Sequence, residues 1–420
     1  RPIIDPETGC PNFFSLKANY RIVENMIEEG MVASACSVGY GGIAEALFKM
    51  GLGNRIGFKM RADMTTHQMF EPMYGSIILE MVSDSPAGML LGETTKEYTF
   101  ESCGEKLDMA ELQEIWESKL EPVYPYRKAG SAVEKINGSL TAPAAPKIGV
   151  AKPKVIIPVF PGTNCEYDTA KAFARAGADP EILVVRNLTP ADVAESCEAL
   201  VKAIDASQIV MLPGGFSGGD EPDGSAKFIA SFFRNPAVTE AVRRLLQQRD
   251  GLMLGICNGF QALIKLGLVP YGDIRPITAC DPTLTFNTIG RHQSMLVHTR
   301  VASTGSPWLS KCEVGEMHTV AISHGEGRFV ANDEVLAQLI ANGQVATQYV
   351  GENGKPSMDL SVNPNGSALA IEGITSPDGR VLGKMGHAER RGDNLYRNVP
   401  EHVPGDKFMP IFESGVAYFA

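Results

Sequence analysis

Apolar runs alternate with amphipathic stretches from residue 154 onward, and this alternation predicts a regular order of strands and helices. Apolar runs at 155–160, 181–185 and 209–212, and a fourth that ends at Ile256, predict strands. Between them, apolar residues recur at helical spacing over 166–176 and 191–204 and around Phe228 and Val242. Strands that alternate with helices of this length predict a doubly wound, parallel α/β sheet, with functional groups at the carboxyl ends of its strands.

Residues 12–127 follow a less regular pattern. Apolar residues at helical spacing predict helices from an N-cap at Ser15 to Gly30, over 43–50 and over 108–119, and runs at 76–82 and 98–100 predict strands. This mixture predicts a first, mixed α/β lobe over residues 1–127.

Residues 128–153 contain Ser, Gly and Pro and show little periodicity, which is typical of an interdomain linker. The expected organisation is therefore a lobe over 1–127, a linker over 128–153 and a second domain over 154–420.

The composition narrows the function classes. At 420 residues the chain exceeds one typical domain, and no uncharged apolar run reaches the length of about 18 residues that indicates a membrane span. A net charge of −11 argues against nucleic-acid and membrane-surface partners, which require basic patches. The eight cysteines include no CxxC pair, which favours a reducing cytoplasm and neither disulfides nor zinc. Arg1 opens what looks like mid-domain sequence, so a fragment or processed product is expected.

The segment Gly255-Ile256-Cys257-Asn258-Gly259 joins an apolar strand to a predicted helix. This is the cysteine version of a nucleophile elbow, in which flanking glycines leave room for a tight turn. The helix that starts at Asn258 would direct its N–H groups and positive dipole end at the sulfur, which favours the reactive thiolate. The alternative interpretation is a buried structural cysteine in an ordinary turn.

A nucleophilic cysteine needs a base and a group that orients the base. His387 is the candidate base, because Glu389 follows two residues later and would lie on the same side in an extended segment. The alternative is that both are solvated loop residues. Asp281, His292 and His298 lack compact ligand spacing, and no metal is assigned.

Acyl transfer also needs donors for an oxyanion. The N–H of Asn258 and a backbone N–H within Gly214-Gly215-Phe216, that of Gly215, are the candidate pair. The alternative interpretation of the glycine pair is a tight strand-to-loop turn. The dense loops at 324–329 and 363–367 are each interpreted as structural turns when taken alone.

Six motifs together resemble a known family. In chain order they are Phe160-Pro161-Gly162-Thr163-Asn164-Cys165, Pro213-Gly214-Gly215-Phe216-Ser217, Gly255-Ile256-Cys257-Asn258-Gly259-Phe260-Gln261, His324-Gly325-Glu326-Gly327, Asn363-Pro364-Asn365-Gly366-Ser367 and His387-Ala388-Glu389-Arg390. Residues 154–420 thereby resemble the class I glutamine amidotransferase domain of the phosphoribosylformylglycinamidine synthase family of purine synthesis. The resemblance implies a doubly wound, flavodoxin-like α/β domain.

The resemblance also implies residue roles. Cys257 would attack the side-chain amide of glutamine to give a glutamyl thioester and ammonia, with His387 as acid and base and Glu389 orienting it. Gln261 and the loop Gly214-Gly215-Phe216 would contact glutamine. The chain departs from the family at Gly218-Gly219-Asp220, where an aromatic residue is common after the serine, and at Lys384-Met385-Gly386, where Met-Pro is common before the histidine.

Residues 12–127 resemble, through the segment 37–47, the carboxyl-terminal lobe of the synthase half, of the aminoimidazole ribonucleotide synthetase-like type. The family usually has His-Asp before Ser-Asp-Gly-Gly, and this chain has Ala35-Cys36 and Gly39-Tyr40 there. The alternative for this glycine-rich turn is a connection that binds no ligand.

For the complete enzyme, the resemblance implies that ATP and Mg²⁺ activate formylglycinamide ribonucleotide and that ammonia then converts it to formylglycinamidine ribonucleotide. The parts that bind ATP and this substrate are expected in an upstream synthase segment of the same polypeptide, and the glutaminase domain is expected to need no cofactor. A competing hypothesis is a cysteine peptidase or hydrolase of the same fold. A third is a non-catalytic subunit, against which the presence of Cys257, His387 and Glu389 argues.

Overall fold

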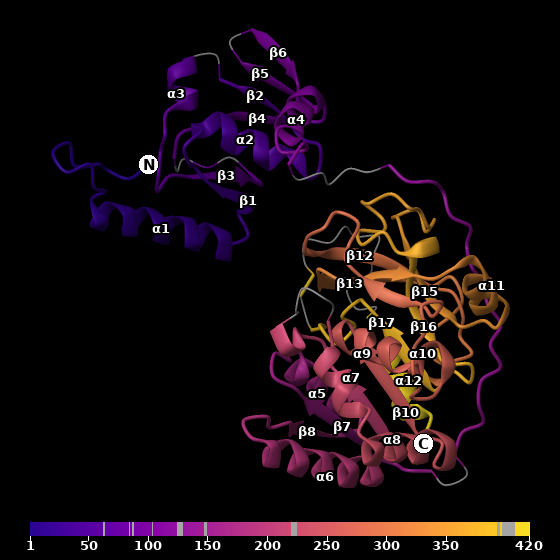
Figure 1. Cartoon of the computed structure of the whole chain (residues 1–420). Coiled ribbons are helices and arrows are strands. Elements are labelled where there is room, and N and C mark those ends of the chain that lie inside the picture. Colours follow the sequence, from indigo (N-terminus) through magenta and orange to yellow (C-terminus); the bar gives the residue numbers. More distant parts are fainter. Residues whose placement is uncertain are drawn as a thin grey trace. The chain divides into compact units, whose positions relative to one another are not determined.

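The computed structural model describes residues 1–61, 64–83, 85, 88–102, 104–123, 129–146, 149–219, 225–392, 395–396 and 408–420. The chain divides into two compact units, residues 1–124 and residues 125–420 (Figure 1). No helix in the described parts has the length and apolar character needed to cross a membrane.

Unit 1 is a mixed α/β structure with two small sheets. One pairs β1 (Val32–Ser37) antiparallel with β3 (Ile77–Met81), and the other has the order β4 (Gly92–Thr95), β2 (Gly57–Met60), β5 (Thr99–Ser102), β6 (Glu105–Asp108). The helices are α1 (Phe13–Glu28), α2 (Gly42–Leu52), α3 (Thr66–Phe70) and α4 (Met109–Ser118). A core of its own, which includes Ile43, Phe100 and Met109, holds this unit together.

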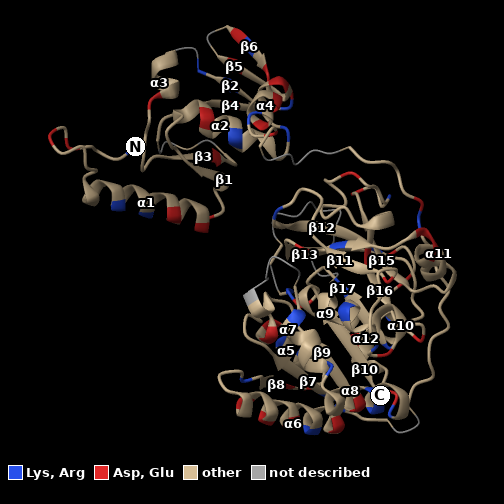
Figure 2. Cartoon of the chain, in the orientation of Figure 1, with Lys and Arg blue, Asp and Glu red and all other residues tan. Residues whose placement is uncertain are grey.

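The prediction of Ser15 as the N-cap of the first helix is wrong. The cap is Asn12, whose side chain accepts a hydrogen bond from the Ser15 N–H at 3.0 Å. Ser15 is therefore the third helical residue, whose N–H needs such an acceptor. The basic residues of α1 come before its acidic residues along the helix, whereas the charged residues of α6 in unit 2 are mostly acidic (Figure 2).

Unit 2 is built on one nine-stranded sheet, in the order β13-β12-β15-β16-β17-β10-β9-β7-β8. The strands are β7 (Lys154–Val159), β8 (Asp179–Val184), β9 (Ile209–Leu212), β10 (Leu252–Ile256), β12 (Gln293–Val301), β13 (Met317–His324), β15 (Val345–Val350), β16 (Ile371–Thr375) and β17 (Val381–Lys384). A short pair, β11 (Thr283–Thr285) and β14 (Arg328–Val330), lies outside this sheet.

The prediction of a parallel sheet is wrong for four of the eight neighbouring strand pairs. From β8 to β17 every neighbouring pair is parallel, and from β17 to β13 every pair is antiparallel. The parallel half contains the apolar strands, and all residues of β9 and β10 are buried, as expected for strands covered on both faces. The sheet is mixed, and β17 is the strand at which its pairing changes.

The helices of unit 2 connect and cover these strands. They are α5 (Glu166–Arg175), α6 (Pro190–Ala206), α7 (Lys227–Phe233), α8 (Pro236–Arg243), α9 (Asn258–Leu266), α10 (Leu268–Tyr271), α11 (Asp333–Ala341) and α12 (Ile411–Ala417). Shorter helical turns are η1 (Ser217–Gly219), η2 (Arg244–Gln248), η3 (Pro307–Leu309) and η4 (Ala368–Ala370). Together with the sheet they enclose one large core, which runs from Ile136 to Phe419.

Part of the predicted linker makes specific contacts with unit 2. The backbone N–H of Ile136 donates to the Gln348 side chain at 2.9 Å, and its C=O accepts from the buried Arg300 guanidinium at 2.7 Å. Arg300 also donates to the Asn137 side chain at 2.6 Å. These groups supply hydrogen-bond acceptors for the buried Arg300 guanidinium. The domain boundaries at 127 and 153 stay a prediction.

Candidate active site

Cys257 lies between β10 and α9, in the turn predicted from its flanking glycines. Its backbone angles are φ 52° and ψ −105°, a conformation that residues with a side chain rarely adopt. The Cys257 N–H donates to the Lys384 C=O at 2.9 Å, and the Cys257 C=O accepts the first helical bond from Gln261 at 3.0 Å. The strained turn is thus held from the neighbouring strand β17 and by the helix that follows.

The two glycines beside Cys257 allow the helix to pack tightly on the sheet. A Cβ on Gly259 would lie 1.9 Å from the Leu212 C=O, and one on Gly255 would lie 2.7 Å from the Gly259 backbone. Neither position has room for a side chain, because β9, β10 and α9 meet there.

His387 and Glu389 come together as an ion pair. The His387 Nδ1 lies 2.5 Å from the Glu389 Oε1, and both side chains are buried. His387 forms a single antiparallel bridge, in which its N–H donates to the Ala321 C=O of β13 at 2.8 Å, and residues 388–389 form a turn. The expectation of an extended segment is therefore wrong, and the turn brings the Glu389 carboxylate to the His387 ring.

Charges around His387 favour its protonated form. Burial lowers the pKa of His387, but the Glu389 carboxylate and then the Cys257 thiol outweigh burial, so the pKa lies well above its usual value. Burial raises the pKa of Glu389, but the charge of His387, the hydrogen bonds to the carboxylate and the charge of Arg390 together outweigh burial, so the pKa lies below its usual value and Glu389 stays ionised. A hydrogen bond to the Cys257 side chain also favours the His387 cation. The Cys257 thiol therefore lies within reach of an imidazole whose Nδ1 is held by Glu389.

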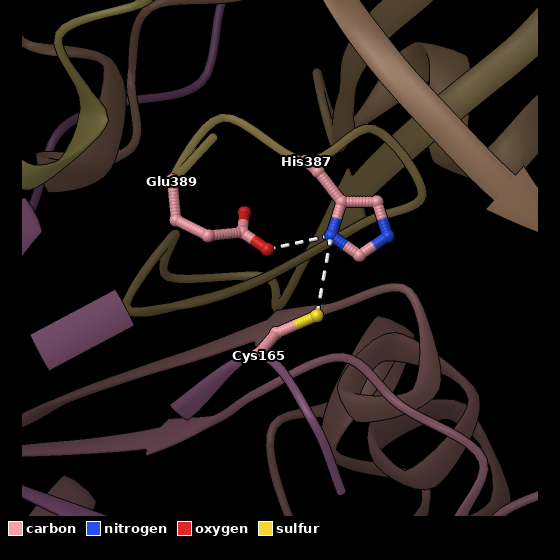
Figure 3. Close-up of side chains that lie close together, drawn as sticks. All are labelled: Cys165, His387 and Glu389. Atoms are coloured by element: carbon pink, nitrogen blue, oxygen red, sulfur yellow. Dashed lines mark hydrogen bonds and ion pairs between the residues drawn. The ribbon is translucent and has the colours of Figure 1, made fainter. Parts of the chain in front are cut away.

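Cys165 is a second thiol beside the same ring, and sequence reasoning did not single it out (Figure 3). Its Sγ lies 3.9 Å from the His387 Nδ1 and accepts from the Arg390 guanidinium at 3.5 Å. Only its position in the loop that follows β7, as the last residue before α5, could have indicated that it reaches this rim of the sheet.

Gly214 packs against the His387 ring. A Cβ on Gly214 would lie 2.6 Å from the His387 Cε1 and 3.1 Å from the Cys165 Sγ. The substrate contact of Gly214 stays a prediction. The structure also explains why residue 214 is a glycine, because a side chain at this position would displace His387.

Gly215 and Asn258 have the backbone features expected of oxyanion donors. Gly215 has φ 148°, and a Cβ there would lie 2.6 Å from the Thr163 Cα. Asn258 is the first residue of α9, so its N–H has no acceptor within the helix. The Phe216 ring lies 5.9 Å from the His292 ring, and the His292 Nε2 lies 3.0 Å from the Ser323 Oγ. The oxyanion and substrate roles of these residues stay predictions.

The Gln261 side chain is buried and both of its polar groups are used within the protein. Its Nε2 donates to the Glu326 C=O at 2.5 Å, and its Oε1 accepts from the Asn258 side chain at 2.8 Å. Gln261 thus connects the elbow helix to the loop that follows His324. A contact between Gln261 and glutamine stays a prediction, and it would require Gln261 to give up one of these two hydrogen bonds.

The loops at 324–329 and 363–367 form one polar network behind Cys257. The Asn365 side chain donates to the Gly327 C=O at 2.7 Å, to the Tyr349 hydroxyl at 3.0 Å and to the His324 Nε2 at 3.4 Å. The Cys257 Sγ itself lies 3.8 Å from the Ser323 C=O, at the start of this network. Sequence reasoning treated these loops as separate turns, because their meeting depends on the strands that carry them.

His324 and Tyr349 are neutral members of this network. Burial, the charge of His387 and His292 lower the pKa of His324 to about 3. Burial, with Glu372 and Cys257 nearby, raises the pKa of Tyr349 well above its usual value. Two neutral groups therefore lie in the network beside the protonated His387.

Two groups of side chains in the described part of the chain could approach a metal ion. They are Cys165, His387 and Glu389, and Cys312, Glu316 and His318, in each of which the ligand atoms lie within 4.8 Å of one another. In the first group His387 and Glu389 are already bonded to each other, which is the arrangement of an acid–base pair. The expectation of no metal stays a prediction.

Comparison with known proteins identifies the family. Residues 152–419 match the model of the CobB/CobQ-like glutamine amidotransferase domain. A curated relative, the phosphoribosylformylglycinamidine synthase subunit PurQ of Salinibacter ruber, is 34% identical over 256 residues, which cover 61% of this chain and 92% of the relative. The chain belongs to the PurQ-like glutamine amidotransferases.

A second curated relative agrees with this assignment. PurQ of Methanococcus maripaludis is 32% identical over 288 residues, 64% of this chain and 97% of that protein. The structure of PurLQS from Thermotoga maritima aligns at 26% identity and a TM-score of 0.45, covering 64% of this chain and all of that one. The PurQ-like match begins at residue 152, so unit 1 lies outside it.

Proposed function

We propose that unit 2 hydrolyses glutamine with Cys257 as nucleophile, His387 as acid and base and Glu389 as the group that orients His387. The observation that carries the proposal is the buried His387–Glu389 pair beside a cysteine in a strained strand-to-helix turn. The family supplies the reaction class, glutamine amidotransfer.

The chemistry follows from these positions. The Cys257 thiolate attacks the side-chain carbonyl carbon of glutamine, and the N–H groups of Asn258 and Gly215 hold the oxyanion. His387 gives its proton to the departing nitrogen, which leaves as ammonia, and a glutamyl thioester remains. His387 then takes a proton from water, whose oxygen attacks the thioester, and glutamate leaves as the thiol is restored.

The ammonia would serve a synthase that converts formylglycinamide ribonucleotide to formylglycinamidine ribonucleotide. The names of the relatives support this, since each is a subunit of phosphoribosylformylglycinamidine synthase. The synthase part would include unit 1 as the end of its carboxyl-terminal lobe, with the rest upstream.

The described residues of unit 1 do not fit a role in holding ATP and Mg²⁺. The Gly41 N–H at the start of α2 donates to the Glu45 carboxylate at 2.9 Å, so an acidic side chain occupies the place that a phosphate would take. In the described part of unit 1, no three potential metal ligands come together. We therefore assign nucleotide binding to the upstream synthase segment and derive no step through it.

The test is release of glutamate from glutamine by the full chain, with and without a supplied synthase segment, ATP and formylglycinamide ribonucleotide. We expect release that depends on Cys257 and rises when the synthase and its substrates are present. Activity on peptides or esters, with none on glutamine in either condition, would instead support the hydrolase hypothesis.

A further inference from the structure

Lys384 and Glu372 form an ion pair next to the candidate site, and both side chains are fully buried. The Lys384 Nζ lies 3.1 Å from the Glu372 Oε1. Lys384 ends β17 and Glu372 lies on the neighbouring strand β16, so the pair sits where the sheet changes from parallel to antiparallel. Removing two charges from water is costly, and apolar residues of similar volume often serve stability as well or better.

The pair binds both backbone groups of Gly386, the residue before His387. The Lys384 Nζ donates to the Gly386 C=O at 2.9 Å, and the Glu372 Oε1 accepts from the Gly386 N–H at 2.5 Å. The second Glu372 oxygen accepts from the Thr347 hydroxyl, which fixes the carboxylate from β15. The orientation of the peptide that leads into His387 is therefore set by the two charged side chains.

The same lysine also holds the nucleophile. Its backbone C=O accepts the N–H of Cys257 at 2.9 Å. Lys384 thus contacts the backbone of Cys257 with one group and the backbone before His387 with another.

We propose that Lys384 and Glu372 are positioning residues that set the place of His387 relative to Cys257. Without them Gly386 loses a donor and an acceptor, and the segment that carries His387 is free to shift. A displacement of about 1 Å of a catalytic group costs up to about 100-fold in rate. The inference rests on the proposed glutaminase function.

The decisive variant is Lys384→Met/Glu372→Leu, because it removes both charges together, leaves no unpaired buried ion and removes both side-chain contacts to Gly386. Its reaction with 6-diazo-5-oxo-L-norleucine, a glutamine analogue that alkylates the nucleophile, separates the maximal rate of Cys257 modification from the affinity for the analogue. We expect the maximal rate to fall about ten- to 100-fold while the affinity changes less than about threefold.

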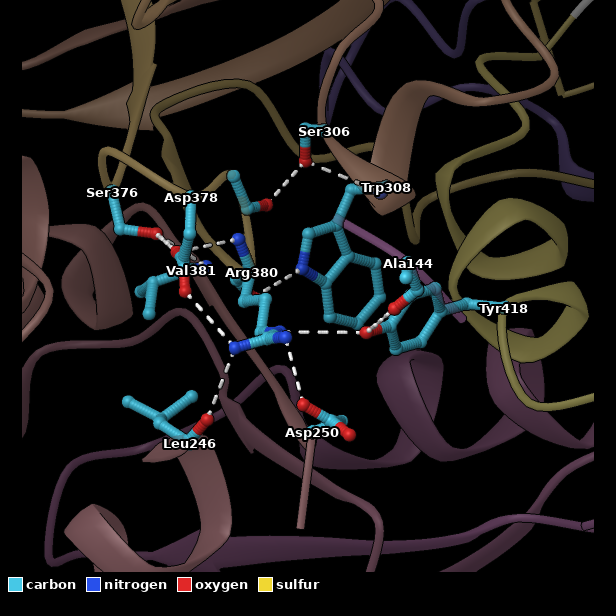
Figure 4. A network of polar contacts seen from close by, with 11 residues as sticks. Ala144, Leu246, Asp250, Ser306, Trp308, Ser376, Asp378, Arg380, Val381 and Tyr418 are labelled. Atoms are coloured by element: carbon cyan, nitrogen blue, oxygen red, sulfur yellow. Dashed lines mark hydrogen bonds and ion pairs between the residues drawn. The ribbon is translucent and has the colours of Figure 1, made fainter. Parts of the chain in front are cut away.

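Arg380→Met is the matched control. Arg380 precedes the other end of β17, and its guanidinium binds Asp250 at 2.8 Å, Asp378 at 3.3 Å and the Leu246 C=O at 3.3 Å (Figure 4). Removing this cation disturbs the same strand far from Gly386. We expect the control to lower stability and to leave the maximal rate of alkylation per folded molecule unchanged.

Other outcomes are decisive too. A double variant that reacts as fast as the wild type would overturn the inference, and so would an equal loss of rate in Arg380→Met. If the double variant does not fold, Glu372→Asp replaces it, since this change keeps both charges and withdraws the carboxylate by one methylene; a wild-type rate would again overturn the inference. A wild-type chain in which the analogue does not modify Cys257 would instead count against the proposed function.

Discussion

Cys165 and Cys257 approach the His387 ring from the ends of two different strands. Cys165 lies on the side of Nδ1, which Glu389 already occupies, whereas Cys257 sits in the strained turn at the start of α9. A base whose Nδ1 is held by a carboxylate has its other nitrogen available for the nucleophile. Cys257 is therefore the thiol placed to attack, and Cys165 is placed to pack.

The first prediction separates these cysteines. Cys165→Ser is expected to keep glutamine hydrolysis within about tenfold of the wild type, and Cys257→Ser to lose at least about 1,000-fold, because only the latter removes the nucleophile. Glutamate release, with the folded state checked by circular dichroism, measures both. A larger loss of activity in Cys165→Ser than in Cys257→Ser would identify Cys165 as the nucleophile.

A second prediction concerns pH and the buried His324. Its pKa of about 3 in the folded state lies below the usual value of 6.5, so the unfolded chain binds the proton more tightly. The free energy of unfolding that depends on neutral His324 is therefore fully present above pH 6.5 and is lost as the pH falls toward 3. His324→Gln is therefore expected to reduce the loss of stability between pH 6 and 4 by roughly 1 kcal/mol per pH unit.

Urea unfolding can measure this slope. The chain has two tryptophans, Trp116 in unit 1 and Trp308 in unit 2, so a Trp116→Phe background reports on unit 2 through Trp308. His67→Gln, at an exposed position in unit 1, is the control and should leave the slope unchanged. Equal slopes in the wild type and His324→Gln would show that His324 does not stay neutral in the folded protein.

At the scale of elements, the strand-to-helix turn from β10 to α9 places the nucleophile, and its glycines make that packing possible. Gly259→Ala is expected to destabilise unit 2 by about 3 kcal/mol or more, because its Cβ would overlap the Leu212 C=O. Gly325→Ala is the matched control, since a Cβ at Gly325 meets nothing within 4 Å. Chemical denaturation of the two variants tests the pair, and a mild effect at Gly259 would mean that α9 can shift away from β9.

The parallel half of the sheet was predictable because its strands are continuous apolar runs between amphipathic helices. The antiparallel half was not, because β12 and β13 contain buried polar residues such as Thr299, Arg300 and His318, which look like exposed positions until their partners are known. The His387–Glu389 contact followed from local spacing. The contacts of Lys384, Glu372 and Cys165 depend on which strands are neighbours, and spacing within one chain segment does not carry that information.

At the scale of the whole molecule, each unit has its own hydrophobic core. Residues 129–146 contribute to the core of unit 2 through Ile136 and to its polar contacts through Ala302, whose C=O accepts from the Gly138 N–H at 2.8 Å. This segment therefore contributes to the stability of unit 2, although its composition is typical of a linker.

Truncation tests this view. A chain of residues 129–420 is expected to fold and to keep Cys257-dependent alkylation, whereas residues 152–420 should be less stable by about 3 kcal/mol because Arg300 loses two of its acceptors and keeps only the Gln348 side chain. Thermal and urea unfolding of the two truncated chains measure the difference. Equal stability would mean that residues 129–151 contribute nothing to the fold of unit 2.

The change of pairing at β17 also has a consequence for protein synthesis. Cys257 leaves β10 and His387 follows β17, and these strands are neighbours in the sheet although a long stretch of chain, including β12, β13, β15 and β16, lies between them. A chain still on the ribosome therefore contains the thiol well before its base, and Lys384 has not yet arrived to bind the Cys257 N–H. We therefore expect glutamine hydrolysis only from chains that include β17 and His387, and no ammonia from a product that ends before them.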